Sequence, residues 1–211
     1  MARRATAQLT MTNKVTVKRN GNNNLDEILK KSAKLMAKQG YHGTSMRDLA
    51  ETTGHSLSGL YHYLESKDDL LFKINERGFI SLIKTAKSIL EQDISSADRL
   101  KAVITNHIDF FSGNMNEMRV MMFGTHDIDR KRSQIISDLK DDYASIVKQV
   151  VRDYLQDQSD KQFSESEITR KTYLLFGMMN WIYGWYSKNE HGSSSELADD
   201  IYATFTLGCL G

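Results

Sequence analysis

Residues 41–64 read YHGTSMRDLAETTGHSLSGLYHYL, and this stretch decides the fold. Met46, Leu49 and Ala50 have the three- and four-residue spacing of a helix with one buried face. Gly54 fits the left-handed residue that commonly ends such a helix. The first half of the stretch therefore predicts a short helix followed by a glycine turn, with a hydroxyl residue just before the helix available as its N-cap.

A second short helix is expected from Leu57 to about Leu64, with Ser56 as its N-cap. A helix of about eight residues is not stable alone, so neighbouring helices must hold one of its faces. The other face carries Ser58, Tyr61 and His62, which can reach phosphates or base edges. Two short helices joined by a glycine turn are typical of a unit that places its second helix in the major groove of DNA. The alternative is a small helical bundle in which the tyrosine and histidine only pack.

The run from about Leu25 to Ile74 resembles the DNA-binding domain of the TetR family of transcriptional regulators. The matching pieces are the Gly-x-x-x-Thr-Ser-Met-Arg-Asp-Leu-Ala segment that starts at Gly40, then Gly54-His55-Ser56, Leu60-Tyr61-His62-Tyr63 and Ser66-Lys67-Asp68-Asp69-Leu70-Leu71. One position departs from the family, because members often have a lysine where this chain has Leu57. An apolar contact with a thymine methyl group is the alternative to a lost polar contact there.

The resemblance implies where this chain contacts DNA. Thr44 and Arg47 would grip phosphate from the second helix, residues 56–59 would lie in the groove, and Lys67 would reach a phosphate from the start of the fourth helix. Phosphate contacts of this kind position a helix, and base-edge contacts specify the site. The complete set of predicted DNA-binding residues is Thr44, Ser45, Arg47, Ser56, Leu57, Ser58, Gly59, Tyr61, His62 and Lys67.

The charge is distributed unevenly along the 211 residues. Residues 1–75 contain 12 Lys/Arg and 7 Asp/Glu, whereas the remaining residues contain 16 and 20. A basic N-terminal part beside a mildly acidic remainder fits a DNA-binding domain attached to a body that does not touch DNA. Residues 1–23 are polar and basic, and we expect a disordered arm. This arm either follows a minor groove or is a solvated extension.

Other classes of protein find little support in the sequence. No stretch approaches the about 18 continuous apolar residues of a membrane helix, and no secretory signal is recognisable. The lone Cys209 fits a reducing cytoplasm, as a buried thiol or, alternatively, a redox sensor. The histidines have no metal-ligand spacing, and no glycine-rich phosphate loop or nucleophile elbow occurs. We therefore expect a cytoplasmic protein that is not an enzyme and has no cofactor, metal or membrane partner.

The body is expected to be helical, so the fold class is all-α. Proline is absent, and helical periodicity runs from Lys67 onward. The expected helices span about 67–91, 97–112, 115–123, 128–156, 165–187 and 194–208, with N-caps at Ser66, Ser96, Ser164 and Ser194. We divide the chain into a basic arm (1–23), a three-helix helix-turn-helix domain (24–74) and a ligand-binding and dimerisation domain (75–211).

The stretch from Tyr173 to Tyr186 is apolar around its full circumference. A helix that is apolar on every side must be buried on every side, and a partner subunit is the simplest cover. The last two helices of two copies would then form a four-helix bundle, as the resemblance also implies. A homodimer presents two recognition helices to a palindromic operator in double-stranded DNA.

The other face of this helix, with a cluster of methionines and phenylalanines, is predicted to line a cavity for a small hydrophobic effector. Plain core packing is the alternative for the methionines. The predicted ligand-binding residues are His107, Phe110, Phe111, Met118, Met121, Met122, Phe123, Tyr173, Phe176, Asn180 and Tyr183.

The C-terminal part looks like that of TetR-type repressors of lipid and sterol catabolism that respond to acyl-CoA thioesters. The similar residues are the Asn180-Trp181-x-Tyr183-x-Trp185-Tyr186 run and the segment from Ser195 to Phe205. This resemblance implies an apolar effector with an anionic head, for which residues 130–132 are candidate phosphate ligands unless they form a solvated turn. We expect a homodimeric repressor released from its operator by an acyl-CoA or another lipid-derived ligand. The alternative is an architectural or cell-division protein that binds DNA without a ligand.

Overall fold

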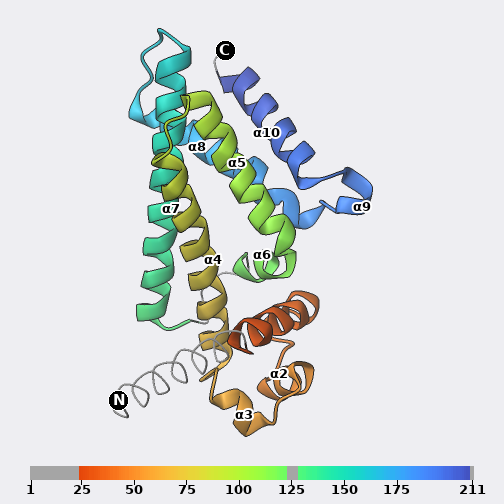
Figure 1. Ribbon diagram of the computed structural model, residues 1–211. Coiled ribbons are helices and arrows are strands. Elements are labelled where there is room, and N and C mark those ends of the chain that lie inside the picture. The colour runs from red at the N-terminus through yellow and green to blue at the C-terminus, as the bar shows by residue number, and fades with distance from the viewer. Residues whose placement is uncertain (1–23, 123–127, 210–211) are drawn as a thin grey trace, which may run out of the picture.

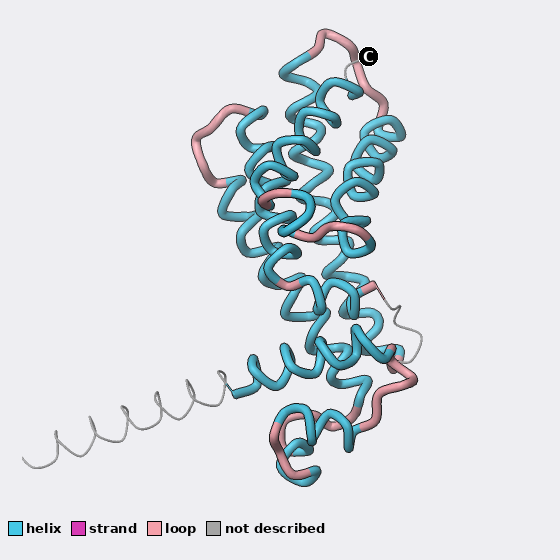
Figure 2. Tube along the Cα trace, turned by 90° about the vertical axis from the view of Figure 1, so that its right-hand side faces the viewer, coloured by secondary structure: helices cyan, strands magenta, loops and turns pink. Residues whose placement is uncertain are grey.

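The computed structural model describes residues 24–122 and 128–209. Within these ranges the chain forms helices and loops and no strand, which confirms the all-α prediction (Figure 2). A helix covers residues 24–39, and it forms a small head together with α2 (Met46–Thr53) and α3 (Leu57–Tyr61) (Figure 1). The body contains α4 (Lys67–Leu90), α5 (Ser96–Gly113), α6 (Met115–Met121), α7 (Arg130–Gln158), α8 (Glu165–Asn180), the 3-10 turn η1 (Trp181–Gly184), α9 (Lys188–His191) and α10 (Ser194–Cys209).

Local signals fix the ends of the head helices. The Ser45 hydroxyl accepts a hydrogen bond from the backbone N–H of Asp48, whose carboxylate accepts from the backbone N–H of Ser45 in return. Gly54 ends α2 in the left-handed conformation, with φ of 76°. Leu49 and Leu60 bring α2 and α3 into one core with the first helix, since neither side chain is accessible to solvent. The predicted helix-turn-helix arrangement is therefore present.

The long helix α4 connects the head to the body without a linker (Figure 1). Ser66 caps its start by accepting from the backbone N–H of Asp69 at 3.1 Å. In the body α4 lies along α7 and also contacts α5 and α6, while α10 lies along α5. The proposed boundary between residues 74 and 75 falls inside α4, so this one helix belongs to both parts. Any displacement of α4 in the body is carried directly to the head.

The helix predicted for residues 165–187 is too long. Regular α8 ends at Asn180, and the chain continues as a 3-10 turn followed by the short helix α9. The break buries Ile182 completely, and it lets the Tyr186 hydroxyl donate to the carbonyl of Gly192 at 2.9 Å. Burial of these two side chains against the body thus overrides the helical periodicity of the segment.

Two predicted N-caps are wrong by one residue. Ser95, rather than Ser96, caps α5 by accepting from the backbone N–H of Asp98 at 3.0 Å. Ser193, rather than Ser194, accepts from the backbone N–H of Glu196, whose carboxylate accepts from Ser193 in turn. In both cases the capping serine is the one with an acidic residue three positions later. Glu196 accepts from the backbone N–H of Ser193, and Asp98 accepts from the Ser95 hydroxyl.

Candidate functional site

The exposed face of α3 carries most of the residues predicted to meet DNA. Leu57, Ser58, Tyr61 and His62 are all exposed, and Tyr61 retains 49% of its accessible surface. The opposite face is anchored by the fully buried Leu60. Because one face of this short helix is packed in the core, the side chains on its other face have fixed positions at the surface.

The Ser56 hydroxyl is already in use at the start of α3. It accepts a hydrogen bond from the backbone N–H of Gly59 at 3.0 Å and lies 3.1 Å from the hydroxyl of Ser58. Ser58 is exposed, so its hydroxyl can also turn outward. Gly59 has no side chain to block an approaching surface, and a Cβ there would lie 3.1 Å from the Ser56 hydroxyl. Ser58 and Gly59 therefore remain predicted groove contacts, while Ser56 mainly caps the helix.

The prediction that Thr44 grips phosphate is contradicted by its position. The Thr44 side chain is 1% exposed, and its hydroxyl donates to the carbonyl of Gly40 at 2.8 Å. Ser45 is exposed but is engaged with Asp48 as the cap of α2. Arg47 is exposed on the same helix. Among these residues Arg47 is thus the side chain best placed to reach a phosphate.

The side chain of Lys67 contacts Tyr41 in the head. Its ammonium group donates to the carbonyl of Tyr41 at 2.9 Å and lies 4.5 Å from the centroid of the Tyr41 ring. An ammonium has three N–H groups, so one such bond leaves donors for a phosphate. The phosphate contact of Lys67 stays a prediction, and the structure adds a second role in fixing the loop before α2.

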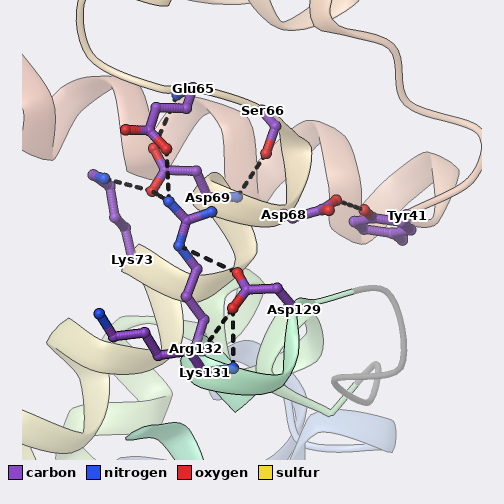
Figure 3. Close-up of polar contacts among 9 residues, drawn as sticks. All are labelled: Tyr41, Glu65, Ser66, Asp68, Asp69, Lys73, Asp129, Lys131 and Arg132. Atoms are coloured by element: carbon purple, nitrogen blue, oxygen red, sulfur yellow. Dashed lines mark hydrogen bonds and ion pairs between the residues drawn. The ribbon is translucent and has the colours of Figure 1, made fainter. Parts of the chain in front are cut away.

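A cluster of charged residues joins the start of α7 to the head (Figure 3). Arg132 pairs with Glu65 at 2.7 Å and lies 3.6 Å from the carboxylates of both Asp69 and Asp129. Asp69 is 1% exposed, and it also pairs with Lys73 at 2.6 Å. We call these five residues the Arg132 cluster.

The position of the Arg132 cluster matters because Glu65 lies in the turn that follows α3. The backbone N–H of Glu65 donates to the buried carboxylate of Asp69 at 3.0 Å. The cluster therefore fixes the end of α3 relative to α4 and α7. Arg132 is engaged here rather than free for a ligand phosphate, whereas Arg130 and Lys131 are exposed. Sequence reasoning missed this role, because Glu65 and Asp69 are about 65 residues away from Arg132 in the chain.

A cavity of about 370 Å³ lies between α4, α5, α7 and α8. It is lined by these residues of the predicted set: His107, Phe111, Met122, Tyr173, Phe176 and Asn180. The residues that sequence reasoning missed are Phe79 from α4 and Ser137, Lys140, Asp141, Tyr143 and Ala144 from α7. A volume of this size is in the range of small-molecule sites, at about 300–1,000 Å³.

Four other predicted ligand-binding residues do not line this cavity. Met118 and Met121 are core residues, and Met121 packs so closely on α4 that a Cβ at Gly78 would lie 3.0 Å from its sulfur. Phe110 borders a separate hollow beside α4 and the first helix. Tyr183 lies in η1, where its carbonyl accepts from Arg119 at 3.3 Å. Phe123 lies outside the described residues.

His107 is a deeply buried polar residue of the cavity wall. It is 2% exposed, and its Nδ1 lies 3.0 Å from the hydroxyl of Tyr143. Burial lowers the pKa of His107 to about 3, against a smaller opposing effect of the Asn180 side chain. Burial also raises the pKa of Tyr143. Both groups are therefore uncharged near neutral pH.

Large apolar side chains remain exposed on α8 and the segments that follow it. These residues are Tyr173, Leu174, Trp181, Trp185 and Leu207. Leu174 and Trp181 are 66% and 62% exposed, and α8 contacts α10, which carries Leu207. Single exposed apolar residues are ordinary, whereas a contiguous apolar patch is typical of an interaction surface, so this group is the candidate for the predicted dimer contact.

Two family models cover the chain. Residues 28–74 match the model for bacterial regulatory proteins of the tetR family, and residues 93–209, more than half of the chain, match the C-terminal domain of tetracycline repressor-like proteins. The chain belongs to the TetR family of transcriptional regulators. Helix α3 lies within the matched residues 28–74, and the contact of its exposed face with DNA stays a prediction.

Relatives with assigned roles are distant in sequence. The fatty acid metabolism regulator protein of Bacillus subtilis (strain 168) is 19% identical over 154 residues, which cover 73% of this chain and 78% of that protein. The HTH-type transcriptional repressor KstR2 of Rhodococcus jostii (strain RHA1) is 25% identical over 122 residues, covering 57% of this chain and 59% of that repressor. Both are regulators by name, in line with the family.

Solved structures of other TetR-family regulators share the fold. PfmR from Thermus thermophilus superposes with a TM-score of 0.76 at 22% identity, covering 84% of this chain and 96% of that chain. AibR, solved in complex with isovaleryl coenzyme A and operator DNA, gives a TM-score of 0.73 at 22% identity, covering 86% and 97%. No helix in residues 24–122 or 128–209 is long and apolar enough to span a membrane. The same residues contain no group of His, Cys, Asp and Glu able to hold a metal.

Proposed function

We propose that this TetR-family regulator is a homodimeric repressor that leaves its operator when a small apolar effector enters the cavity between α4, α5, α7 and α8. The observation that carries the proposal is that α4 forms a wall of the cavity through Phe79 and also continues into the head. A ligand that displaces α4 would change the spacing of two recognition helices in a dimer. Only a difference in affinity for the two forms can drive this change.

We further propose an acyl-CoA as the effector class. Relatives support it by name, since one regulates fatty acid metabolism and another was solved with isovaleryl coenzyme A and operator DNA. The cavity supports it by its aromatic lining and by an open mouth flanked by Lys140. A volume of about 370 Å³ accommodates an acyl group, with the coenzyme outside the cavity.

The test is binding of the full-length protein to a fluorescent DNA fragment from upstream of its own gene, at roughly 0.15 M salt. Fluorescence anisotropy is measured with and without hexanoyl-CoA and palmitoyl-CoA. We expect specific binding that either thioester weakens. Specific binding that ignores both thioesters would overturn the acyl-CoA effector and leave a regulator with another signal. Binding without preference for this DNA would favour the architectural alternative.

A further inference from the structure

The cavity wall contains one deeply buried polar atom without a partner. His107 Nε2 is buried and has no hydrogen-bond partner of normal geometry among the described residues. The Asn180 side chain of the same wall interacts with the ring, but it offsets only part of the effect of burial on the His107 pKa. Leaving a buried donor or acceptor unpaired costs about 1–3 kcal/mol, so such atoms in native structures need an explanation. A ligand group that completes the hydrogen bond is one explanation, because this histidine lines an open cavity.

The partner on the other side of the ring decides which nitrogen carries the proton. Tyr143 is 2% exposed, and its hydroxyl lies 3.0 Å from His107 Nδ1. This is the one hydrogen bond of that hydroxyl within residues 24–122 and 128–209. A tyrosine hydroxyl can donate or accept, but with no other acceptor among the described residues its own proton is paired only when it donates to Nδ1. In that arrangement the proton of the neutral imidazole lies on Nε2. Nε2 therefore needs an acceptor.

The acceptor must be uncharged. Burial keeps the imidazole neutral, as the lowered pKa of about 3 indicates. A carboxylate placed at that depth would lose its hydration without gaining a cation, which is costly in an apolar environment. A carbonyl oxygen meets the requirement, because it accepts a hydrogen bond without carrying a full charge.

The cation of this site is at the mouth of the cavity. Lys140 lines the cavity and is exposed, which places it where the cavity meets solvent, with its ammonium group 6.0 Å from the centroid of the Phe79 ring. It forms no ion pair within the part of the chain that the structure describes, and partial burial lowers its pKa. Asp141 lines the same opening, so an anionic group would lie on the side of Lys140. The wall is thus neutral at depth and cationic at one side of the entrance.

We propose that the effector is an acyl compound whose carbonyl oxygen accepts a hydrogen bond from His107 Nε2, while its anionic part lies against Lys140. Tyr143 is the positioning residue, because its hydroxyl holds the imidazole in the donating tautomer. This inference rests on the proposed function, since it assigns the polar contacts of the same cavity. It adds a requirement that the acyl oxygen, and not only the chain, is recognised.

The first experiment compares hexanoyl-CoA with S-hexyl-CoA, a thioether that lacks only the carbonyl oxygen. Calorimetry on the full-length protein is expected to show about tenfold weaker binding of the thioether, because it leaves the His107 N–H unpaired. Equal affinities would overturn the inference. If both compounds then released the DNA fragment equally, the proposed function would stand. If neither bound, the acyl effector itself would be excluded together with its contact.

Substitutions in the cavity wall test which side chains make the proposed contacts with the ligand. In the double variant His107→Phe/Tyr143→Phe, which leaves no unpaired hydroxyl, the two ligands should bind equally. Lys140→Met should weaken hexanoyl-CoA severalfold, whereas Lys84→Met, an exposed lysine of α4 that does not line the cavity, should not. Nitrogen NMR of the ligand-free protein should show His107 protonated on Nε2. Protonation on Nδ1, or a preference for the thioester that persists in the double variant, would overturn the assignment.

Discussion

At the scale of single residues, His107 makes the stability of the fold depend on pH. Its pKa is about 3 in the folded protein, whereas a histidine in an unfolded chain titrates near about 6.5. Below about pH 6.5 His107 binds a proton in the unfolded chain but not in the folded protein. The free energy of unfolding therefore falls with falling pH. The loss should be about 1 kcal/mol per pH unit until the folded pKa is approached.

Urea unfolding of the ligand-free protein at pH 7 and at pH 5 measures this loss. The variant His107→Phe/Tyr143→Phe should lose less stability over the same interval, because it lacks the group that titrates. Other carboxylates and histidines contribute equally to both proteins, so the difference between the two slopes isolates His107. Identical slopes would show that His107 can be protonated in the folded state.

Substitutions of Thr44 and Arg47 should have different effects, because Thr44 contributes to stability and Arg47 is predicted to contact DNA. Thr44→Val keeps the volume but removes the hydrogen bond to the Gly40 carbonyl, so it should destabilise the protein by about 1 kcal/mol. Folded Thr44→Val should bind DNA as the wild type does. Arg47→Ala should have the opposite profile, with unchanged unfolding and a weaker, less salt-dependent affinity. Thermal unfolding and DNA titrations at two salt concentrations distinguish these outcomes.

At the scale of helices, the Arg132 cluster connects α7 to the turn after α3. Arg132→Ala would leave the buried Asp69 with Lys73 as its remaining cation, and it would release Glu65. We expect a loss of about 1 kcal/mol in stability and a smaller ratio between operator affinities without and with effector. Lys84→Ala is the control, because Lys84 is an exposed cation of α4 that belongs neither to the cluster nor to the cavity lining. Unfolding curves and anisotropy titrations of both variants provide the comparison, and an unchanged ratio in Arg132→Ala would exclude coupling through this cluster.

The helices that sequence reasoning predicted well are those with local signals. Ser45 with Asp48, and Ser164 with Glu167, form reciprocal caps that depend on residues three positions apart. The end of α8 had no such signal, because the break depends on where Ile182 and Tyr186 are buried in the body. The α7 residues that line the cavity were not predicted, for a similar reason. Tyr143 meets His107 across 36 residues of sequence, and only the packing of α7 on α5 brings the two together.

At the scale of the whole molecule, the exposed apolar residues around α8 predict a dimer. Leu174→Asp places a charge on this surface and should give a monomer of 24.1 kDa with little affinity for a palindromic operator. Ile80→Asp is the matched control, since Ile80 is also half exposed but lies on α4. Sedimentation velocity measures the assembly of both variants. A dimer that survives Leu174→Asp would place the interface elsewhere.

The Arg132 cluster has a consequence for protein engineering. Regulators are often recombined by joining the DNA-binding part of one to the sensing part of another, with the junction chosen from the sequence. In this chain a junction after residue 74 would cut through α4, and it would separate Glu65 and Asp69 from Arg132. A graft that brings an unmatched partner to residue 132 would bury the Asp69 carboxylate with less compensation. Functional hybrids of this protein should therefore transfer the start of α7 together with the head.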